Sequence, residues 1–240
     1  MIFTVQLADQ LIEIQTDTPE LRDFFKDYMV QPAPAEITIS WTNEEVLGER
    51  DTLDCDFPYG YLETLAILRK ISEFFPSKRR LLIHGASISH RDKGYLFTAP
   101  SGTGKSTHIK LWRKYLGEDV RIVNGDKPFI SLKEPQVYIF GTPWAGKENW
   151  HRNCKVPLSG ICFVQRGTTN SIRKLSPLEA LPLLMNQVFM PKDATGVGLT
   201  LELIDLLLQK VPLYLLKCDI SEEAVRCSFE AMTGLPYSSH

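Results

Sequence analysis

The 240-residue sequence has no excess of basic residues. Lys and Arg total 27 while Asp and Glu total 29, which leaves a formal net charge of −2. A global positive field that would hold nucleic acid or an anionic membrane is therefore absent, and we expect neither as a partner. Any anion that this protein binds must be held by a local cluster of donors.

The sequence also predicts no membrane span and no secretory leader. The chain begins Met-Ile-Phe-Thr-Val-Gln, with no basic stretch followed by an apolar one. Its longest apolar tract, residues 199–218, is broken by Glu202, Asp205, Lys210 and Pro212. It falls short of the ~20 largely apolar residues that a membrane span needs. The sequence therefore predicts a cytoplasmic protein without a membrane segment.

Cysteine is scarce and follows no pattern. The cysteines are odd in number and scattered, at Cys55, Cys154, Cys162, Cys218 and Cys227. No Cys-x-x-Cys pair occurs among them, so neither a disulfide framework nor a zinc site is predicted. We expect free thiols in a reducing compartment.

The composition is that of an ordinary globular chain, 43% hydrophobic and 23% charged. Its length allows one large domain or two small ones. The patterns favour an N-terminal accessory α+β unit at residues 1–55 and a second domain at residues 56–240. In the first unit we expect a short helix capped by residues 18–20. The polar composition of residues 32–56 predicts a long loop or a soft domain boundary. The expected strands of the first unit are residues 2–7, 11–15 and 36–41, the first two forming a hairpin.

Strand and helix patterns alternate in the second domain. Helical spacing from Pro58 to Phe75 predicts a long helix that ends at Pro76 and packs on the core of this domain. Strands are expected at residues 80–85, 86–89, 95–99, 120–123, 129–132, 137–140, 158–164, 172–175 and 213–218. Later helices are expected at residues 177–189, 199–209 and 222–232. The alternation predicts an α/β fold with a mixed sheet.

A glycine-rich loop stands between the strand at residues 95–99 and a helix that ends at Gly117. The loop consists of Ser101, Gly102, Thr103, Gly104, Lys105, Ser106 and Thr107. Glycines let successive backbone N–H groups converge on phosphate oxygens, and the helix N-terminus adds its positive dipole end. The sequence therefore predicts a nucleotide-phosphate site, with a flexible turn before a helix as the alternative. Ala99 stands where the strict phosphate-loop pattern has its first glycine.

Two residues are candidate ligands of Mg²⁺. The Ser106 hydroxyl is expected to ligate the ion, while Lys105, which we expect to face solvent, reaches the β- and γ-phosphates of ATP. Asp126 follows the loop by about 20 residues, at a strand end, and is the natural second magnesium ligand. The alternative for Asp126 is a turn-forming role in the sequence Gly-Asp-Lys-Pro.

Together with Ile83-His84-Gly85 and Ile122-Val123-Asn124-Gly125-Asp126, the loop resembles the catalytic domain of the HPr kinase/phosphorylase family. The fold of that domain is related to the P-loop nucleotide-binding domain of ATP-dependent phosphoenolpyruvate carboxykinase. The resemblance covers roughly residues 58–235. The chain is also similar to short HPr-kinase-like proteins in which a small N-terminal unit precedes this domain. It implies that the loop binds ATP, that Asp126 binds Mg²⁺ and that His84 lies beside the reacting γ-phosphate. It also implies that a homo-oligomer can form, since the related enzyme is a hexamer.

Two departures from the family pattern bear on the chemistry. Gly125 occupies the position of the first of the family's two adjacent aspartates, the one that accepts and donates the proton. The glutamate-arginine-glycine signature tied to the phosphorylase reaction is missing, since residues 140–149 read Phe-Gly-Thr-Pro-Trp-Ala-Gly-Lys-Glu-Asn. The resemblance therefore implies a kinase without its usual base, and reversal of the reaction with inorganic phosphate is not expected.

Two side chains are candidates for the missing roles. His84 can take a proton from a hydroxyl, with a hydrogen-bonded core histidine as the alternative. Glycine and proline hinges at residues 141–147 predict a lid that delivers Lys147 to the γ-phosphate, as an arginine finger does in other P-loop enzymes.

Other cations and aromatic residues near these motifs are less specific. Arg152, Lys155 and Arg166 are further cations, which the sequence does not rank, with a solvated surface role as the alternative for each. Trp144 or Trp150 is a candidate to stack on adenine, with packing in the core as the alternative.

The expected function is that of a Mg²⁺- and ATP-dependent kinase. It transfers the γ-phosphate to a hydroxyl, either a serine of a protein or peptide or a small metabolite. Lys105, His84, Asp126 and Lys147 are the candidate catalytic residues. The alternative is a catalytically weak, nucleotide-binding regulatory or interaction module. A decarboxylating carboxykinase is disfavoured, because 240 residues leave little room for its substrate domain.

Overall fold

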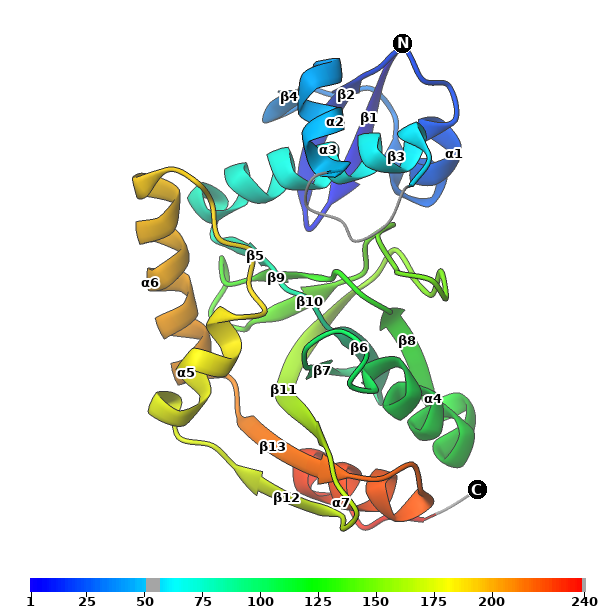
Figure 1. Ribbon diagram of the computed structural model, residues 1–240, viewed down its shortest axis with the longest axis vertical. Helices are drawn as coiled ribbons and strands as arrows, with labels where there is room; N and C mark the ends of the chain where they lie inside the picture. Colours follow the sequence, from blue (N-terminus) through cyan, green and yellow to red (C-terminus); the bar gives the residue numbers. More distant parts are fainter. Residues whose placement is uncertain (51–56, 239–240) are drawn as a thin grey trace.

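The computed structural model describes residues 1–50 and 57–238. These residues form a mixed α/β fold on two sheets, one of four strands and one of nine. Figure 1 places the four-strand sheet, in blue, at one end of the molecule and the larger sheet, mostly green, toward the other. The helix α3 (Tyr59–Phe74) lies between them.

The N-terminal sheet begins with the hairpin that alternation predicts. Its strands, in spatial order, are β3 (Met29–Val30), β1 (Ile2–Leu7), β2 (Gln10–Gln15) and β4 (Ile37–Ile39). β1 and β2 pair antiparallel through a turn at Ala8 and Asp9, whose φ angles of 49° and 60° suit a tight hairpin. The predicted hairpin is thus confirmed, and the strand expected at residues 36–41 is present as β4.

Residues 43–50 form a helix, so the long loop expected within residues 32–56 is wrong for this part, and residues 51–56 lie outside the described residues. The helices of the N-terminal region, besides α3, are α1 (Leu21–Phe25) and α2 (Asn43–Arg50). The Oγ1 of Thr42 accepts a hydrogen bond from Glu45 N at 3.3 Å, and the Glu45 carboxylate accepts one from Thr42 N at 2.9 Å. This reciprocal pair is a capping box. Val46 is buried against Leu62 and Ala66 of α3, which explains why a polar stretch is ordered here.

The helix expected after residues 18–20 is α1, but its N-cap, Glu20, makes no side-chain capping bond. The domain boundary expected between residues 55 and 56 lies outside the described residues and stays a prediction.

The helix α3 does not pack on the second domain alone. Ile67 and Ile71 share one buried cluster with Val5 of the N-terminal sheet and with Leu82 and Phe129 of the larger sheet. The expectation that this helix belongs to the second core is therefore wrong in part, because its apolar faces are covered from both sides. One continuous apolar cluster joins the two sheets.

The nine-strand sheet has the spatial order β5-β9-β10-β11-β7-β6-β8, with β13 paired to β11 and β12 paired to β13. Its strands are β5 (Arg80–Leu82), β6 (Ala86–His90), β7 (Lys93–Thr98), β8 (Val120–Asn124), β9 (Phe129–Ser131), β10 (Tyr138–Phe140), β11 (Lys155–Arg166), β12 (Ser171–Lys174) and β13 (Leu213–Cys218). Parallel and antiparallel pairs both occur, so the predicted mixed sheet is confirmed.

Helices cover both faces of this sheet. They are α4 (Lys105–Leu116), α5 (Pro177–Met185), α6 (Ala194–Lys210) and α7 (Glu222–Thr233). Along β11, Ile161 and Phe163 belong to the cluster that contains α5 and α6, while Cys162 and Val164 belong to the cluster that contains α4 and α7. Alternate residues of a strand point to opposite faces, so α5 and α6 lie on one face and α4 and α7 on the other.

Strand direction determines which loops meet. β11 is parallel to β7, and β6 is antiparallel to both β7 and β8. The ends of β7, β8 and β11 and the start of β6 therefore lie at one edge of the sheet. Loops at the carboxyl edge of such strands are where open α/β sheets bind ligands.

None of the helices in the described ranges is long and apolar enough to cross a membrane. Cys154, Cys162, Cys218 and Cys227 are free thiols, as expected, and Cys55 lies outside the described residues. Within the described chain, no group of three His, Cys, Asp or Glu side chains is placed to hold a metal ion.

Candidate functional site

The glycine-rich loop connects β7 to α4, as the sequence predicts. Gly102 and Gly104 adopt φ angles of 74° and 121°, which side chains other than glycine rarely tolerate. A Cβ atom at either position would meet nothing within 4 Å, so the space in front of the loop is open. No side chain caps α4 at Gly104. The first N–H groups of this helix therefore point outward without a side-chain partner, as at an anion-binding helix N-terminus.

Ala99 replaces the first glycine of the strict pattern without strain. It is buried directly after β7, and it is not among the residues with positive φ. An alanine can hold an ordinary backbone conformation there. The substitution therefore leaves the geometry of the loop intact.

Lys105 is buried, which corrects the expectation that it faces solvent. It is 7% exposed, and its Nζ donates hydrogen bonds to the carbonyl oxygens of Ala99 at 2.9 Å and Pro100 at 3.4 Å. Burial lowers the pKa of the Lys105 ammonium group, with Asp126 acting in the opposite direction. The ammonium group is held inside the loop, where the loop carbonyls replace water.

Asp126 and His84 meet at this edge of the sheet. Asp126 follows β8 and His84 precedes β6, so strand direction brings them together. Gly85 N donates to the Asp126 carbonyl at 2.8 Å, and Thr98 Oγ1 donates to the His84 carbonyl at 2.7 Å. Nε2 of His84 lies 3.4 Å from Oδ1 of Asp126. Two residues that the sequence singled out separately thus form one pair beside the loop.

The carboxyl group of Asp126 is held in its ionised form. Burial raises its pKa, but the hydrogen bond to His84 and the charges of Lys127 and Lys105 lower it further, and the net direction is downward. Asn124 fixes the backbone here, because its Oδ1 accepts from Asp126 N at 2.8 Å and from Lys127 N at 2.7 Å. The sequence analysis missed this role of Asn124, although Asn followed by Gly is a known turn signal and an Asn side chain can bond the backbone two residues on.

His84 is also held from the opposite side, by Gln187. Its backbone N–H donates to the Gln187 carbonyl at 2.7 Å, and its Nδ1 lies 3.2 Å from Gln187 Oε1. Gln187 is buried and follows α5 directly. The sequence analysis missed it, because nothing local indicates that a glutamine far along the chain meets His84.

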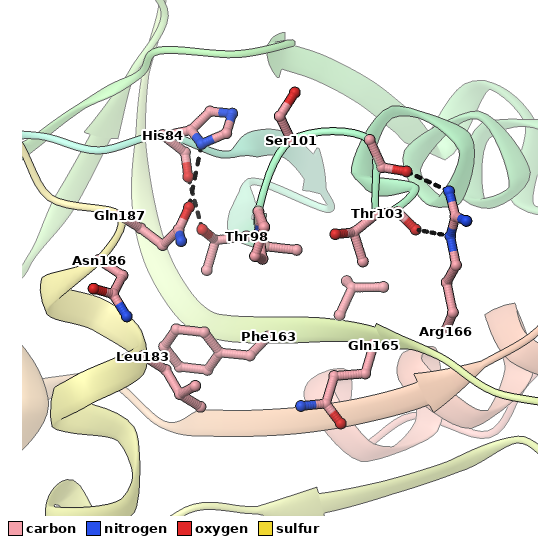
Figure 2. Close-up of a pocket in the computed structure, with 14 residues that line it drawn as sticks. His84, Thr98, Ser101, Thr103, Phe163, Gln165, Arg166, Leu183, Asn186 and Gln187 are labelled. Atoms are coloured by element: carbon pink, nitrogen blue, oxygen red, sulfur yellow. Dashed lines mark hydrogen bonds between the residues drawn. The ribbon is translucent and has the colours of Figure 1, made fainter.

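A cavity of about 1050 Å³ opens between the loop and the end of α5. We call it the loop cavity; its walls include His84, Thr103, Phe163, Arg166, Leu183 and Gln187. Figure 2 shows His84 and Gln187 at one end, Arg166 and Thr103 at the other, and Phe163 and Leu183 along the floor. The volume is that of a small-molecule site.

The structure ranks the cations that the sequence left unranked. The Arg166 guanidinium donates to the carbonyl oxygens of Gly102 and Thr103, so it braces the loop from β11. Lys155, at the opposite end of β11 from Arg166, pairs with Asp9 and Glu134. The Arg152 side chain is exposed, and its backbone N–H donates to the Val123 carbonyl. Only Arg166 of these three lines the loop cavity.

The predicted lid at residues 141–147 passes close to Asp126. A Cβ atom at Gly146 would lie 3.1 Å from the Asp126 Cβ. Lys147 itself is exposed and is not among the described residues that line the loop cavity. The structure therefore brings the segment to the site but not the Lys147 ammonium group, whose delivery stays a prediction.

Neither tryptophan lies in the loop cavity. Trp144 is buried among aromatic side chains that include Phe25, and its Nε1 donates to the Thr64 carbonyl at 2.9 Å. Trp150 is partly buried, with Lys110 Nζ 4.8 Å from its ring centroid. Trp144 therefore packs in the core, which was the alternative for this residue. Adenine stacking has no support at either tryptophan.

Gly125, where the family resemblance expects an aspartate, has no room for a side chain. A Cβ atom would lie 2.7 Å from the Ala145 carbonyl oxygen. The Gly125 N–H donates to the Trp150 carbonyl at 2.8 Å, so Ala145 of the lid and Trp150 just after it both contact this residue. The missing base is therefore not replaced at the same position.

Comparison with known protein families finds none that matches this chain, and comparison with curated proteins finds no relative. Among solved structures, the chain is similar to the Hpr(Ser) kinase/phosphatase from Coxiella burnetii. The sequence identity is 13%, the TM-score is 0.36, and the match covers 64% of this chain and 99% of that one. A likeness of this degree identifies no activity, so the function has to follow from the residues of the site.

Proposed function

We propose that this protein is a kinase that binds ATP with Mg²⁺ at the β7–α4 loop and transfers the γ-phosphoryl group to a hydroxyl. One observation carries the proposal: an open loop with an uncapped helix N-terminus lies beside an ionised carboxylate, Asp126, and an imidazole, His84. Anion-binding N–H groups and a carboxylate that can hold a cation are the two parts that phosphoryl transfer requires.

The residues present fit both proposed ligands. The loop from Ser101 to Thr107 offers backbone N–H groups to the phosphates, with Lys105 as the neutralising cation. Asp126 and the Ser106 hydroxyl would hold Mg²⁺. That ion commonly takes one or two protein oxygens together with phosphate and water. Bound there, Mg²⁺ would supply charge neutralisation at the transferred group.

Each candidate catalytic residue has a distinct task in this proposal. His84 accepts the proton of the acceptor hydroxyl, and Asp126 stabilises the imidazolium that results. Lys105 leaves the loop carbonyls for the phosphate oxygens when the nucleotide binds, because the phosphates carry more charge. Lys147 approaches when the lid closes over Asp126.

Calorimetric titration of the full chain with ATP, with and without Mg²⁺, tests the first half of the proposal. We expect ATP binding that strengthens with Mg²⁺ and weakens again when EDTA removes the ion. Incubation with γ-labelled ATP and candidate hydroxyl acceptors then tests transfer. The absence of ATP binding would overturn the whole proposal.

A second candidate function is a nucleotide-binding regulatory or interaction module. The observation that favours it is the contact at Gly125, which leaves no room for the carboxylate base of the resembling family. Tight binding of ATP with no transfer to any acceptor would support the regulatory function and exclude the kinase function. Phosphoryl transfer that depends on His84 would exclude the regulatory function.

A further inference from the structure

The two ends of the loop cavity differ in the residues that line them. At one end, Arg166 already donates to the carbonyl oxygens of Gly102 and Thr103. At the other end, His84 and the last turn of α5 face each other (Figure 2). A hydroxyl that reacts beside His84 must enter from this second end. We call it the acceptor end; it consists of His84, Phe163, Leu183, Asn186 and Gln187.

The acceptor end is lined by apolar carbon and neutral amides. Phe163 and Leu183 form its floor, and the carboxamides of Asn186 and Gln187 stand above them (Figure 2). No lysine, arginine, aspartate or glutamate is among the described residues that line it. An anionic ligand group would lose hydration here without gaining a counter-charge, because the charged side chain that contacts His84, that of Asp126, is itself anionic. Carboxamides, in contrast, both donate to and accept from uncharged hydroxyl and amide groups.

The surrounding sheet is unsuited to an extended peptide. Extended peptides are commonly bound by pairing with an exposed strand edge. The two strands that line the loop cavity are β7 and β11, and each is already paired on both sides, β7 by β6 and β11, and β11 by β7 and β13. The acceptor end is a concave hollow between these strands and α5, which suits a small molecule.

We propose that the acceptor end binds the phosphoryl acceptor, and that the acceptor is a small uncharged hydroxyl compound, such as a polyol or a hydroxy-amide. This inference rests on the proposed kinase function. In the reaction, the acceptor oxygen bonds to the γ-phosphorus while the bond from that phosphorus to the β,γ-bridging oxygen breaks. ADP leaves with the bonding electron pair, and the hydroxyl proton passes to the imidazole ring of His84. Asn186 and Gln187 hold the acceptor's other polar groups, and Phe163 and Leu183 contact its carbon atoms.

Matched pairs of acceptors that differ only in charge test the proposal. The probes are N-acetylserinamide against N-acetylserine, glycerol against glycerate, and a capped seven-residue peptide with a central serine. Transfer from γ-labelled ATP is measured on the full chain. The uncharged member of each pair is expected to have a kcat/KM at least tenfold higher than its anionic counterpart. A preference for the anions, phosphorylation of the peptide alone, or transfer to none of the probes would overturn the acceptor class.

MgATP binding separates failure of this inference from failure of the proposed function. If MgATP binds but none of the small uncharged probes is phosphorylated, the acceptor class is wrong while the nucleotide site stands. If MgATP does not bind, both proposals fail. Calorimetry on the same protein preparation decides between the two outcomes.

Two variants locate the acceptor within the loop cavity. Asn186→Asp places a carboxylate at an exposed position of the acceptor end; it should raise KM for the uncharged acceptor by tenfold or more with unchanged MgATP affinity. Leu183→Arg should shift preference toward the anionic member of each pair. Leu178→Arg is the matched control, since Leu178 lies on the same helix, 82% exposed. Equal KM values in Asn186→Asp and Leu178→Arg would place the acceptor elsewhere.

Discussion

Nε2 of His84 lies 3.4 Å from Oδ1 of Asp126, and this contact joins the start of β6 to the end of β8. The two side chains are 29% and 27% exposed, so solvent reaches them from one side only. Gln187 holds the other nitrogen of the imidazole ring, at 3.2 Å. The imidazole is therefore fixed between an amide and a carboxylate, an arrangement that orients a proton acceptor.

Asp126→Asn should lower the affinity for Mg²⁺ while leaving the fold intact. The substitution keeps the size of the side chain, and Asn124 still binds the backbone N–H groups of residues 126 and 127. The loss of charge should reduce the apparent Mg²⁺ affinity in the presence of ATP by about tenfold, equivalent to about 1.4 kcal/mol. Titration of ATP turnover or binding with Mg²⁺ measures the effect. Asp92→Asn, in the exposed β6–β7 turn, is the control, and an unaltered titration for Asp126→Asn would leave Asp126 with a turn-forming role.

Lys105→Ala should affect both nucleotide binding and stability. Because Lys105 is buried and donates to two loop carbonyls, its removal leaves the Ala99 oxygen without this partner. We expect a cost of about 1 kcal/mol in unfolding free energy, together with a loss of ATP affinity of at least tenfold. Urea denaturation and calorimetry measure the two effects. Lys114→Ala, on an exposed part of the same helix, should change neither, and undiminished ATP affinity in Lys105→Ala would remove the lysine from the site.

The start of α5 should loosen in acid. Glu179 accepts hydrogen bonds from the backbone N–H and the hydroxyl of Ser176 and pairs with Arg173, and these contacts lower its pKa to about 2 from 4.5. Because the folded pKa is depressed, the stabilisation is complete above pH 4.5 and is lost as the pH falls toward 2. The melting temperature of Glu179→Gln should therefore lie below that of the native chain at pH 7 and converge with it near pH 2. A constant difference across this range would contradict the assignment.

The parts of the site that could be predicted from the sequence are those that depend on neighbouring residues. The run from β7 through the loop into α4 is local, and so is the placement of Asp126 at the end of β8. Strand, loop and helix have distinct signals in consecutive residues, which is why this part of the α/β fold agrees with the structure. The same holds for the β1–β2 hairpin.

The parts that could not be predicted depend on how distant strands pair. Arg166 reaches the loop only because β11 lies parallel to β7, and Gln187 reaches His84 only because α5 ends against this edge. Without these pairings, the sequence offers Arg166 only as one of three unranked cations and gives no reason to select Gln187. The helix α2 is a different case, since the Thr42–Glu45 capping box was a local signal that the polar composition outweighed.

Gly125→Ala should destabilise the protein although it adds a single methyl group. The new Cβ would lie 2.7 Å from the Ala145 carbonyl oxygen, a backbone atom that cannot turn aside as a side chain can. Forced displacements of this kind cost about 1–3 kcal/mol. Gly198→Ala, within α6 and with nothing within 4 Å of the added carbon, should instead stabilise by roughly 0.5–1 kcal/mol. Chemical denaturation of both variants gives the comparison.

The same contact predicts the fate of a restored carboxylate. Gly125→Asp would reintroduce the base that the family resemblance expects, but its Cβ meets the same Ala145 oxygen, so the lid segment beside Asp126 must move. We expect lower stability than in the native chain and no gain in phosphoryl transfer, because the displaced segment includes Gly146, which packs on Asp126. Measurement of turnover beside the unfolding free energy separates the alternatives. A variant that is both stable and faster would show that the lid leaves room for a base at residue 125, and that proton transfer by His84 limits the native rate.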